Sequence, residues 1–190
     1  MPLPAGARDV RWVRLDGLHL TLRFLGPTEA DRIPPTIAAV EAVAAAVTGP
    51  IRIELSGSGT FPPGRRPRAL WIGVSAGGQE LAELAARTEE ALVEAGWQPE
   101  GRPFRPHLTL ARSDGVSVGP LVAQRLASAM AGRGIACTLD TLGLFESITG
   151  GGPARYEPVA LRELGSAAVS SDRVYHQPAP EASGGSPGQT

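Results

Sequence analysis

The tetrapeptide His19-Leu20-Thr21-Leu22 recurs as His107-Leu108-Thr109-Leu110 in this chain of 190 residues. The sequence holds only three histidines, so two of the three share one local context. Given one copy, a second histidine followed by Leu-Thr-Leu arises by chance in roughly one case in a thousand on average residue usage. The repeat is therefore the feature from which we predict both the fold and the site.

Each copy has the composition of a β-strand, because Leu, Thr and Phe fit a pleated, half-buried surface. We expect the first of these strands to run from His19 to Leu25. Alternate residues of a strand point to the same face. Each motif thus presents its histidine and threonine side by side and directs its two leucines into a core. Two such surfaces facing each other would form a site with two imidazoles and two hydroxyls.

Length, net charge, hydropathy and cysteine content indicate what kind of protein this is. The length fits one domain or two small lobes that share a core. A formal net charge of −1 does not indicate that the chain as a whole binds nucleic acid. The sequence has no apolar run long enough to span a membrane and no signal peptide at its start. Cys137, the only cysteine, has no internal disulfide partner, which is typical of a reducing compartment. We expect a cytoplasmic monomer that binds no membrane.

Strands and helices alternate along the chain. Periodicity and turn residues predict helices at 33–47, 79–95 and 121–130, and strands at 10–15, 51–55, 69–74, 135–140, 142–148 and 156–164 beside the two motif strands. The order after each motif is similar, which favours pseudo-symmetry. We predict an α+β fold: bilobal and pseudo-symmetric, with two mainly antiparallel sheets around a central cleft and helices on the outside. One domain should cover 1–165, followed by a disordered tail at 166–190.

Two opposed histidines suit a reaction in which one proton is taken and another is given. A histidine side chain ordinarily has a pKa of about 6.5, so near neutral pH one imidazole can accept a proton while its partner donates one. Each role typically accelerates a reaction by about 10²–10⁴-fold. The hydroxyls of Thr21 and Thr109 can donate hydrogen bonds to anionic oxygens. Two such hydroxyls in one cleft would bind a phosphate.

Further candidates for substrate binding flank the motifs. Arg105 precedes His107 by two residues, and Arg112 ends the second motif strand, where alternation leaves its direction open. Arginine suits phosphate because its planar fork can donate two parallel hydrogen bonds. Arg68 belongs to a loop of proline, glycine and arginine that could extend a basic patch toward a polyanion. Phe24 follows the first motif closely and is a candidate for lining the cleft.

The motifs also have other interpretations. A single His-x-Thr strand is usually half-buried sheet without chemistry, and only the duplication argues against that reading. Two histidines alone rarely hold a metal, and no carboxylate lies at ligand spacing in either motif, so we expect no metal and no cofactor. A serine triad would need a nucleophile elbow, and nothing in the sequence resembles one.

The chain resembles the two-histidine phosphoesterase superfamily, and within it the RNA 2′,3′-cyclic phosphodiesterases, also called 2′-5′ RNA ligases. The likeness runs from about Val10 to about Gly165. The matching stretches are Arg11-Trp12-Val13-Arg14, the first motif continued by Arg23-Phe24-Leu25-Gly26, Phe61-Pro62, Pro67-Arg68-Ala69-Leu70-Trp71-Ile72-Gly73-Val74, the second motif between Phe104-Arg105-Pro106 and Ala111-Arg112, and Leu142-Gly143-Leu144-Phe145-Glu146-Ser147. The paired motif in its Pro-His-Leu-Thr-Leu-Ala-Arg context is a specific signal.

The resemblance implies hydrolysis of a 2′,3′-cyclic phosphate at an RNA end, without metal, leaving a 2′-phosphate. RNA ends that carry such a phosphate would be the partner. The resemblance also implies that His19 donates a proton to the leaving 3′-oxygen and that His107 is the base that activates water. Thr21 and Thr109 would hold the phosphate oxygens. The residues alone do not distinguish the roles of the two histidines.

The chain departs from the family pattern at its start. Family members usually begin with an apolar strand and a helix, whereas here about ten residues rich in Pro, Gly and Ala precede the Trp-Val segment. A missing strand would expose a sheet edge and apolar surface. Two alternatives to the RNA phosphodiesterase therefore stay open. One is an RNA- or nucleotide-binding protein with little turnover, and the other is a phosphodiesterase acting on another small cyclic phosphate.

Overall fold

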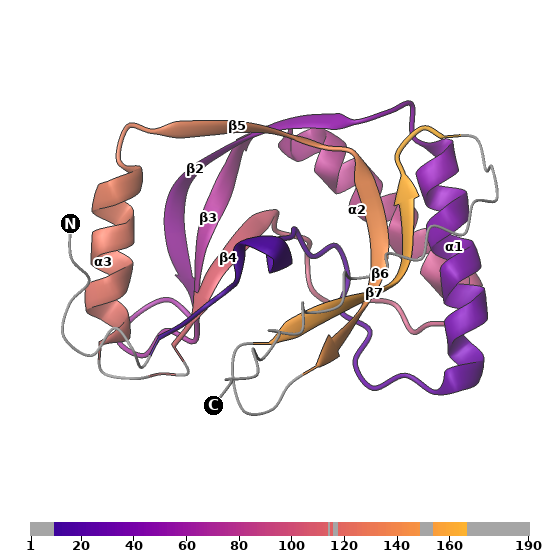
Figure 1. The fold of residues 1–190 in the computed structure, drawn as a ribbon, viewed down its shortest axis with the longest axis horizontal. Helices are drawn as coiled ribbons and strands as arrows, with labels where there is room; N and C mark the ends of the chain where they lie inside the picture. The colour runs from indigo at the N-terminus through magenta and orange to yellow at the C-terminus, as the bar shows by residue number, and fades with distance from the viewer. Residues whose placement is uncertain (1–9, 114, 116–117, 149–153, 167–190) are drawn as a thin grey trace, which may run out of the picture.

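The computed structural model describes residues 10–113, 115, 118–148 and 154–166 (Figure 1). The tail predicted for 166–190 lies outside these residues except for its first position. In chain order the elements are β1 (Arg11–Trp12), α1 (Ile33–Ala46), β2 (Ile51–Phe61), β3 (Ala69–Ala76), α2 (Gly78–Glu94), β4 (His107–Arg112), α3 (Gly119–Met130), β5 (Gly134–Leu139), β6 (Thr141–Ile148) and β7 (Arg155–Glu163). Two short 3-10 turns, Leu15–Gly17 and Ala30–Arg32, precede α1.

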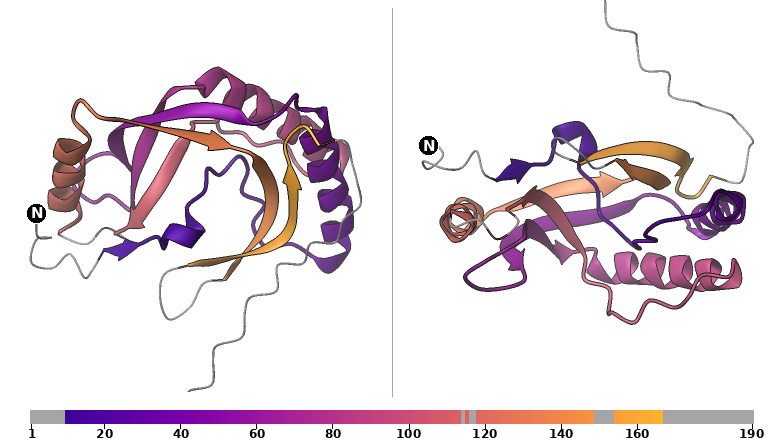
Figure 2. Two further views of the ribbon diagram at one scale, coloured as in Figure 1. Left: turned by 45° about the horizontal axis from the view of Figure 1, so that its top comes forward. Right: turned by 90° about the horizontal axis from the view of Figure 1, so that it is seen from below.

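The strands form two sheets in which every pair is antiparallel. Five strands make a curled sheet in the order β1-β4-β3-β2-β5, and β6 pairs with β7 in a sheet of two. In the right-hand view of Figure 2, α2 and the β6–β7 hairpin lie on opposite sides of β2. The predicted α+β class with antiparallel sheets is confirmed. The two sheets are unequal in size. β5, which follows α3, pairs with β2 at the edge of the larger sheet, and the chain then turns into the β6–β7 hairpin.

All three predicted helices are confirmed, with ends shifted by at most two residues. The strand predicted for 51–55 is longer than expected and runs on to Phe61. The sequence Gly57-Ser58-Gly59 favours a break, but here it forms an irregularity in the pairing of β2 with β3. Such a bulge adds residues to one strand and bends it without ending it.

The prediction of a strand from His19 to Leu25 is wrong. This segment touches the sheet through one isolated bridge, between Leu20 and Leu108 of β4. The strand predicted for 10–15 is likewise reduced to β1. Beyond it Val13 N–H still donates to the Leu110 carbonyl of β4 at 2.8 Å, and the 3-10 turn Leu15–Gly17 follows. A strand needs a continuous partner for its backbone groups, and propensity alone does not supply one.

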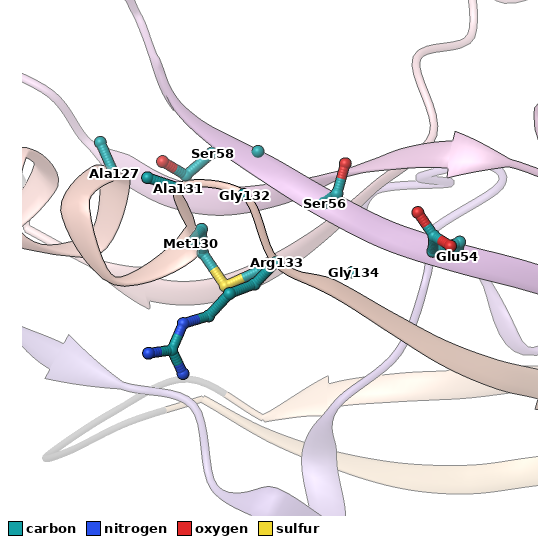
Figure 3. A pocket seen from close by; sticks show the side chains of 10 residues that line it. Glu54, Ser56, Ser58, Ala127, Met130, Ala131, Gly132, Arg133 and Gly134 are labelled. Carbon is teal, nitrogen blue, oxygen red and sulfur yellow. The ribbon is translucent and has the colours of Figure 1, made fainter.

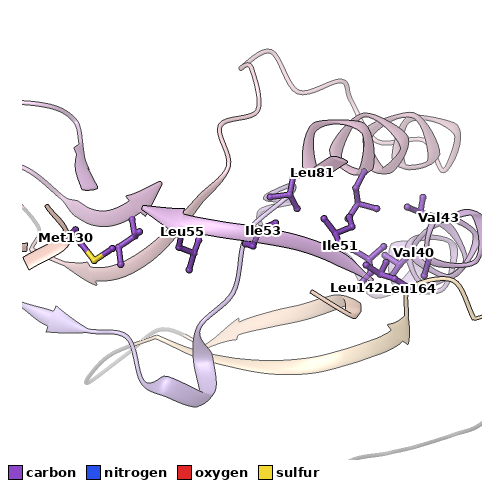
Figure 4. Close-up of a cluster of buried hydrophobic side chains, with 12 residues drawn as sticks. Val40, Val43, Ile51, Ile53, Leu55, Leu81, Met130, Leu142 and Leu164 are labelled. Atoms are coloured by element: carbon purple, nitrogen blue, oxygen red, sulfur yellow. The ribbon is translucent and has the colours of Figure 1, made fainter. Parts of the chain in front are cut away.

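β2 lies at the centre of the hydrophobic core (Figure 4). Its residues Ile51, Ile53 and Leu55 are all less than a tenth exposed. The surrounding residues come from all three helices and from the hairpin, and they include Val40, Val43, Leu81, Leu84, Met130, Leu142 and Leu164. The four motif leucines pack against the same cluster, as the alternation predicts. No helix in the described part of the chain is long and apolar enough to cross a membrane.

We expect Leu81→Ala in α2 to lower the free energy of unfolding by about 2–5 kcal/mol, because this side chain is 1% exposed and its loss leaves a cavity in the core. The matched control is Leu15→Ala, at a leucine that is 88% exposed, which should change stability by no more than about 0.5 kcal/mol. Urea denaturation measures both. Equal losses at the two positions would contradict the assignment of the core.

Candidate active site

The bridge between Leu20 and Leu108 brings the two motifs together. Because it is antiparallel, its register sets His19 beside Thr109 and, by the same symmetry, the other threonine beside the other histidine. Both bridging leucines pack against the core, so the four polar side chains share the opposite face. The two histidines are diagonal neighbours across the bridge, a relation that corresponds to about 7–8 Å in a regular antiparallel pair.

Each motif histidine is held by a hydrogen bond to the backbone two residues before it. Nδ1–H of His19 donates to the carbonyl oxygen of Gly17 at 2.8 Å, and Nδ1–H of His107 donates to that of Arg105 at 2.7 Å. A carbonyl oxygen can only accept, so the hydrogen lies on Nδ1 in both rings. Nε2 of each ring is therefore the atom that can take up or release a proton.

The two histidines have different aromatic neighbours. The His19 ring meets Tyr156 edge-on, with centroids 4.4 Å apart, and lies parallel to Phe145 at 6.4 Å. The His107 ring lies 5.0 Å from Phe61 and 6.0 Å from Trp71. The first pair belongs to the β6–β7 hairpin and the second to β2 and β3. The β6–β7 hairpin thus forms the wall beside His19, and the large sheet forms the wall beside His107.

A β-bulge in β4 determines on which face of the sheet the Arg112 side chain lies. In the pairing of β3 with β4, Trp71 faces Thr109 and Leu70 faces Ala111, so one residue of β4 is extra. Strict alternation would put Thr109 and Arg112 on opposite faces. The extra residue restores them to one face, because a bulge shifts the alternation by one position. The Arg112 side chain is exposed on the face that carries the motif histidines.

The other predicted binding residues, Arg105, Arg68 and Phe24, are all exposed. The Arg105 side chain is exposed, and the residue contributes its carbonyl to His107. Arg68 is also exposed, while its backbone N–H donates to the carbonyl of Phe61 at 2.7 Å. Phe24 is 68% exposed, and the rings found against His19 are those of the hairpin instead.

Sequence reasoning missed the role of Arg23, which anchors the first motif to α2. Its guanidinium forms a 2.7 Å ion pair with Glu89 and donates to the carbonyl of Gln98 at 2.7 Å. The side chain is only 12% exposed, so this pair is shielded from solvent. A search of the sequence for charges next to the motif would have found the residue but not its partner, which lies 66 positions away.

Exposed ion pairs occur shortly before both motifs. Arg14 donates two hydrogen bonds to Asp16 in the turn before His19, and these hold the pKa of that carboxyl below its usual value. Arg102 does the same to Glu100 before His107 and lowers the pKa of Glu100. Fully exposed pairs contribute little to stability.

A separate hollow of about 480 Å³ lies between the end of α3 and the irregular part of β2 (Figure 3). Ser56, Ser58 and Glu54 border it, and neither motif histidine does. Glu54 accepts a hydrogen bond from the Ser75 hydroxyl at 2.9 Å. Figure 3 shows the Arg133 side chain extending away from the two serines. The described residues contain no group of three or more His, Cys, Asp or Glu that could hold a metal.

Residues 7–151 match the family model of the 2'-5' RNA ligase superfamily. A protein of Aeropyrum pernix named RNA 2',3'-cyclic phosphodiesterase is 36% identical over 118 residues, which cover 62% of this chain and 65% of that protein. A protein of Aquifex aeolicus with the same name is 38% identical over 104 residues, 54% of each. The chain thus spans less than two thirds of either relative. The crystal structure of TT0787 of Thermus thermophilus has a TM-score of 0.66 at 24% identity over 85% of both chains, which shows a shared fold.

We expect Gly59→Ala to displace Trp71 from the His107 wall. A Cβ at this position would lie 2.2–2.8 Å from three atoms of the Trp71 ring, so the ring has to move. Overpacking of this kind typically costs about 1–3 kcal/mol of stability. The measurement is the free energy of unfolding of Gly59→Ala in the wild-type and in a Trp71→Leu background. The cost should largely vanish in the second background, and an unchanged cost would show that the clash lies elsewhere.

Proposed function

The chain belongs to the 2'-5' RNA ligase superfamily, and on that premise we propose that it hydrolyses 2′,3′-cyclic phosphates at RNA ends to 2′-phosphates, without metal. The names of the two relatives support this activity. We extend the proposal to a monomer acting in the cytoplasm, where a lone, unpaired Cys137 is an ordinary feature.

The observation that carries the proposal is the matched pair of backbone hydrogen bonds to Nδ1 of His19 and His107. With both tautomers fixed, each Nε2 is available for proton transfer, one as acceptor and one as donor. A metal site or a serine triad would not require two such rings in symmetric settings. Acid–base catalysis at a single phosphorus atom uses two such groups, one that takes a proton and one that gives a proton.

In the proposed mechanism His107 accepts a proton from water through Nε2. The oxygen of that water attacks phosphorus while the bond from phosphorus to the 3′-oxygen breaks. His19 donates its Nε2 proton to the leaving 3′-oxygen, which becomes a hydroxyl, and the phosphate stays on the 2′-oxygen. One proton is taken and one is given, so the two histidines end in exchanged protonation states and are restored by solvent.

Thr21 and Thr109 are proposed to donate hydrogen bonds to the non-bridging oxygens of the phosphate. Their place on the histidine face supports this role. Donors fixed in this way stabilise the charge that develops on the oxygens in the transition state. Arg112 supplies a positive charge on the same face, and Arg105 and Arg68 extend that charge along the margin.

We expect His19→Ala and His107→Ala each to lower the hydrolysis of a nucleoside 2′,3′-cyclic phosphate by about 10²–10⁴-fold in the presence of EDTA. The matched control is His176→Ala, which removes the remaining histidine of the chain and should keep full activity. The product is identified as the 2′-phosphate by its resistance to enzymes specific for 3′-phosphates.

Each result of that assay has a distinct meaning. Loss of activity in EDTA would contradict metal independence. A folded wild-type protein that binds the nucleotide without hydrolysing it would replace the proposal with the binding-only alternative. Retained activity in either motif variant would rule out the paired acid–base mechanism.

We expect Thr21→Val and Thr109→Val to lower kcat by about 10²–10³-fold, the usual cost of losing one fixed donor to a developing oxyanion. Valine keeps the shape of threonine, so the loss reports the hydroxyl. The control is Thr28→Val, at an exposed threonine whose hydroxyl donates to the carbonyl of Gly26 outside the site. An effect on KM alone would show that the hydroxyls bind the ground state and the transition state equally, and would contradict the proposed role.

A further inference from the structure

One carboxylate of α2 contacts both of the segments that carry the motif histidines. Oε2 of Glu89 accepts a hydrogen bond from Arg23 at 2.7 Å, and Oε1 accepts one from the backbone N–H of Glu100 at 2.6 Å. Arg23 follows Thr21 by two residues, and Glu100 precedes His107 by seven. Glu89 therefore joins the chain just after the first motif to the chain just before the second.

The first motif depends on such an anchor because its backbone has little pairing. The segment 19–25 is not a strand, and it meets the sheet through the isolated bridge between Leu20 and Leu108. In a regular antiparallel pair a continuous ladder of backbone hydrogen bonds would fix its position. Here the Arg23 guanidinium also donates to the carbonyl of Gln98 at 2.7 Å, in the loop that leads to the second motif. Side-chain hydrogen bonds thus do for this segment what backbone pairing does for a strand.

The loop before the second motif is also held by side chains. Residues 95–106 join α2 to β4 without a helix or strand. The indole N–H of Trp97 donates to the hydroxyl of Thr36 in α1 at 2.9 Å, which fixes the start of the loop. Glu89 binds the loop farther along, at Glu100, and so closer to the motif. The approach of the chain to β4 is therefore set from α2.

The Arg23–Glu89 pair is partly withdrawn from solvent. The Arg23 side chain is 12% exposed and the Glu89 side chain 30%. In the described part of the chain the buried Nε–H of Arg23 has no hydrogen-bond partner, so the guanidinium is fixed through its two terminal nitrogens. Hydrogen bonds between ionised groups are shorter and stronger than neutral ones. The pair is thus suited to hold a fixed geometry.

We propose that Glu89 is a positioning residue, which keeps the segments of His19 and His107 in one relative position. The proposal rests on the proposed function, in which the Nε2 atoms of both rings act on one phosphate. A displacement of about 1 Å between reacting groups can lower a rate by about 10²-fold. Glu89 acts through the two chain segments and not by contact with the substrate.

The first test is Glu89→Gln. An amide has one acceptor oxygen where the carboxylate has two, so one of the two segments loses its bond. With a nucleoside 2′,3′-cyclic phosphate, kcat should fall about tenfold or more and KM should change by less than about twofold, because the groups that bind the phosphate are unchanged. The control is Glu83→Gln, which makes the same change in charge at an exposed glutamate of α2 that accepts a hydrogen bond from Gln79, and it should keep the wild-type kcat. Equal losses in the two variants, or an effect on KM alone, would overturn the proposal.

A double variant separates positioning from stability. Arg23→Met/Glu89→Leu removes both charges together, and apolar replacement of a shielded ion pair often preserves stability. Its urea midpoint should lie above that of Glu89→Gln, while its kcat should stay at least about tenfold below that of the wild-type protein. Recovery of kcat together with stability would show that the pair is only structural and would overturn the proposal.

Hydrogen exchange tests the same contacts without turnover. Glu89→Gln should speed amide exchange in both 19–25 and 98–107, and Glu83→Gln should speed it in neither. Unchanged exchange in either segment of Glu89→Gln would overturn the positioning role. Absence of any hydrolysis by the wild-type protein would instead refute the proposed function, and the positioning role with it, even where exchange shows that Glu89 holds both segments.

Discussion

The antiparallel register between Leu20 and Leu108 is the constraint on which the site depends. The four motif leucines pack against the core, and the register places the histidine of each motif beside the threonine of the other. A slip of one position would exchange the two sets and bury the histidines. The apolar contacts of the leucines therefore hold the imidazoles on a common face. Packing in the core therefore fixes the geometry of the candidate site.

The aromatic side chains that surround the two motif histidines differ. His19 meets rings of the hairpin, while His107 meets rings of the large sheet. Two identical tetrapeptides thus lie in unlike surroundings, which would let one residue type serve the two roles proposed above. The hairpin joins the rest of the molecule through core contacts of Leu142 and Leu164 with α1. The environment of His19 consequently depends on how well those two leucines pack.

The helices and the four motif residues could be predicted from the sequence because periodicity and duplication are local signals. The bulge in β4 could not be predicted. Its extra residue is a leucine like any other in a strand, and only the pairing with β3 shows that it has no partner there. The strand expected around Thr21 failed for a related reason: its composition is right, but it has one bridge and no continuous neighbour. Tyr156 and Phe145 reach His19 from a hairpin far along the chain, and no pattern next to the motif indicates them.

The position of the bridge also bears on the ancestry of the fold. An antiparallel bridge between two equivalent leucines lies on a twofold axis, and that axis exchanges one motif for the other. Two separate copies of a half-length chain, each with one motif, would form the same cluster of two histidines and two threonines by pairing as a homodimer. Joining the copies in one polypeptide frees each half to change alone. Different aromatic neighbours around identical motifs are what we expect when a gene is duplicated and fused and its two halves then diverge.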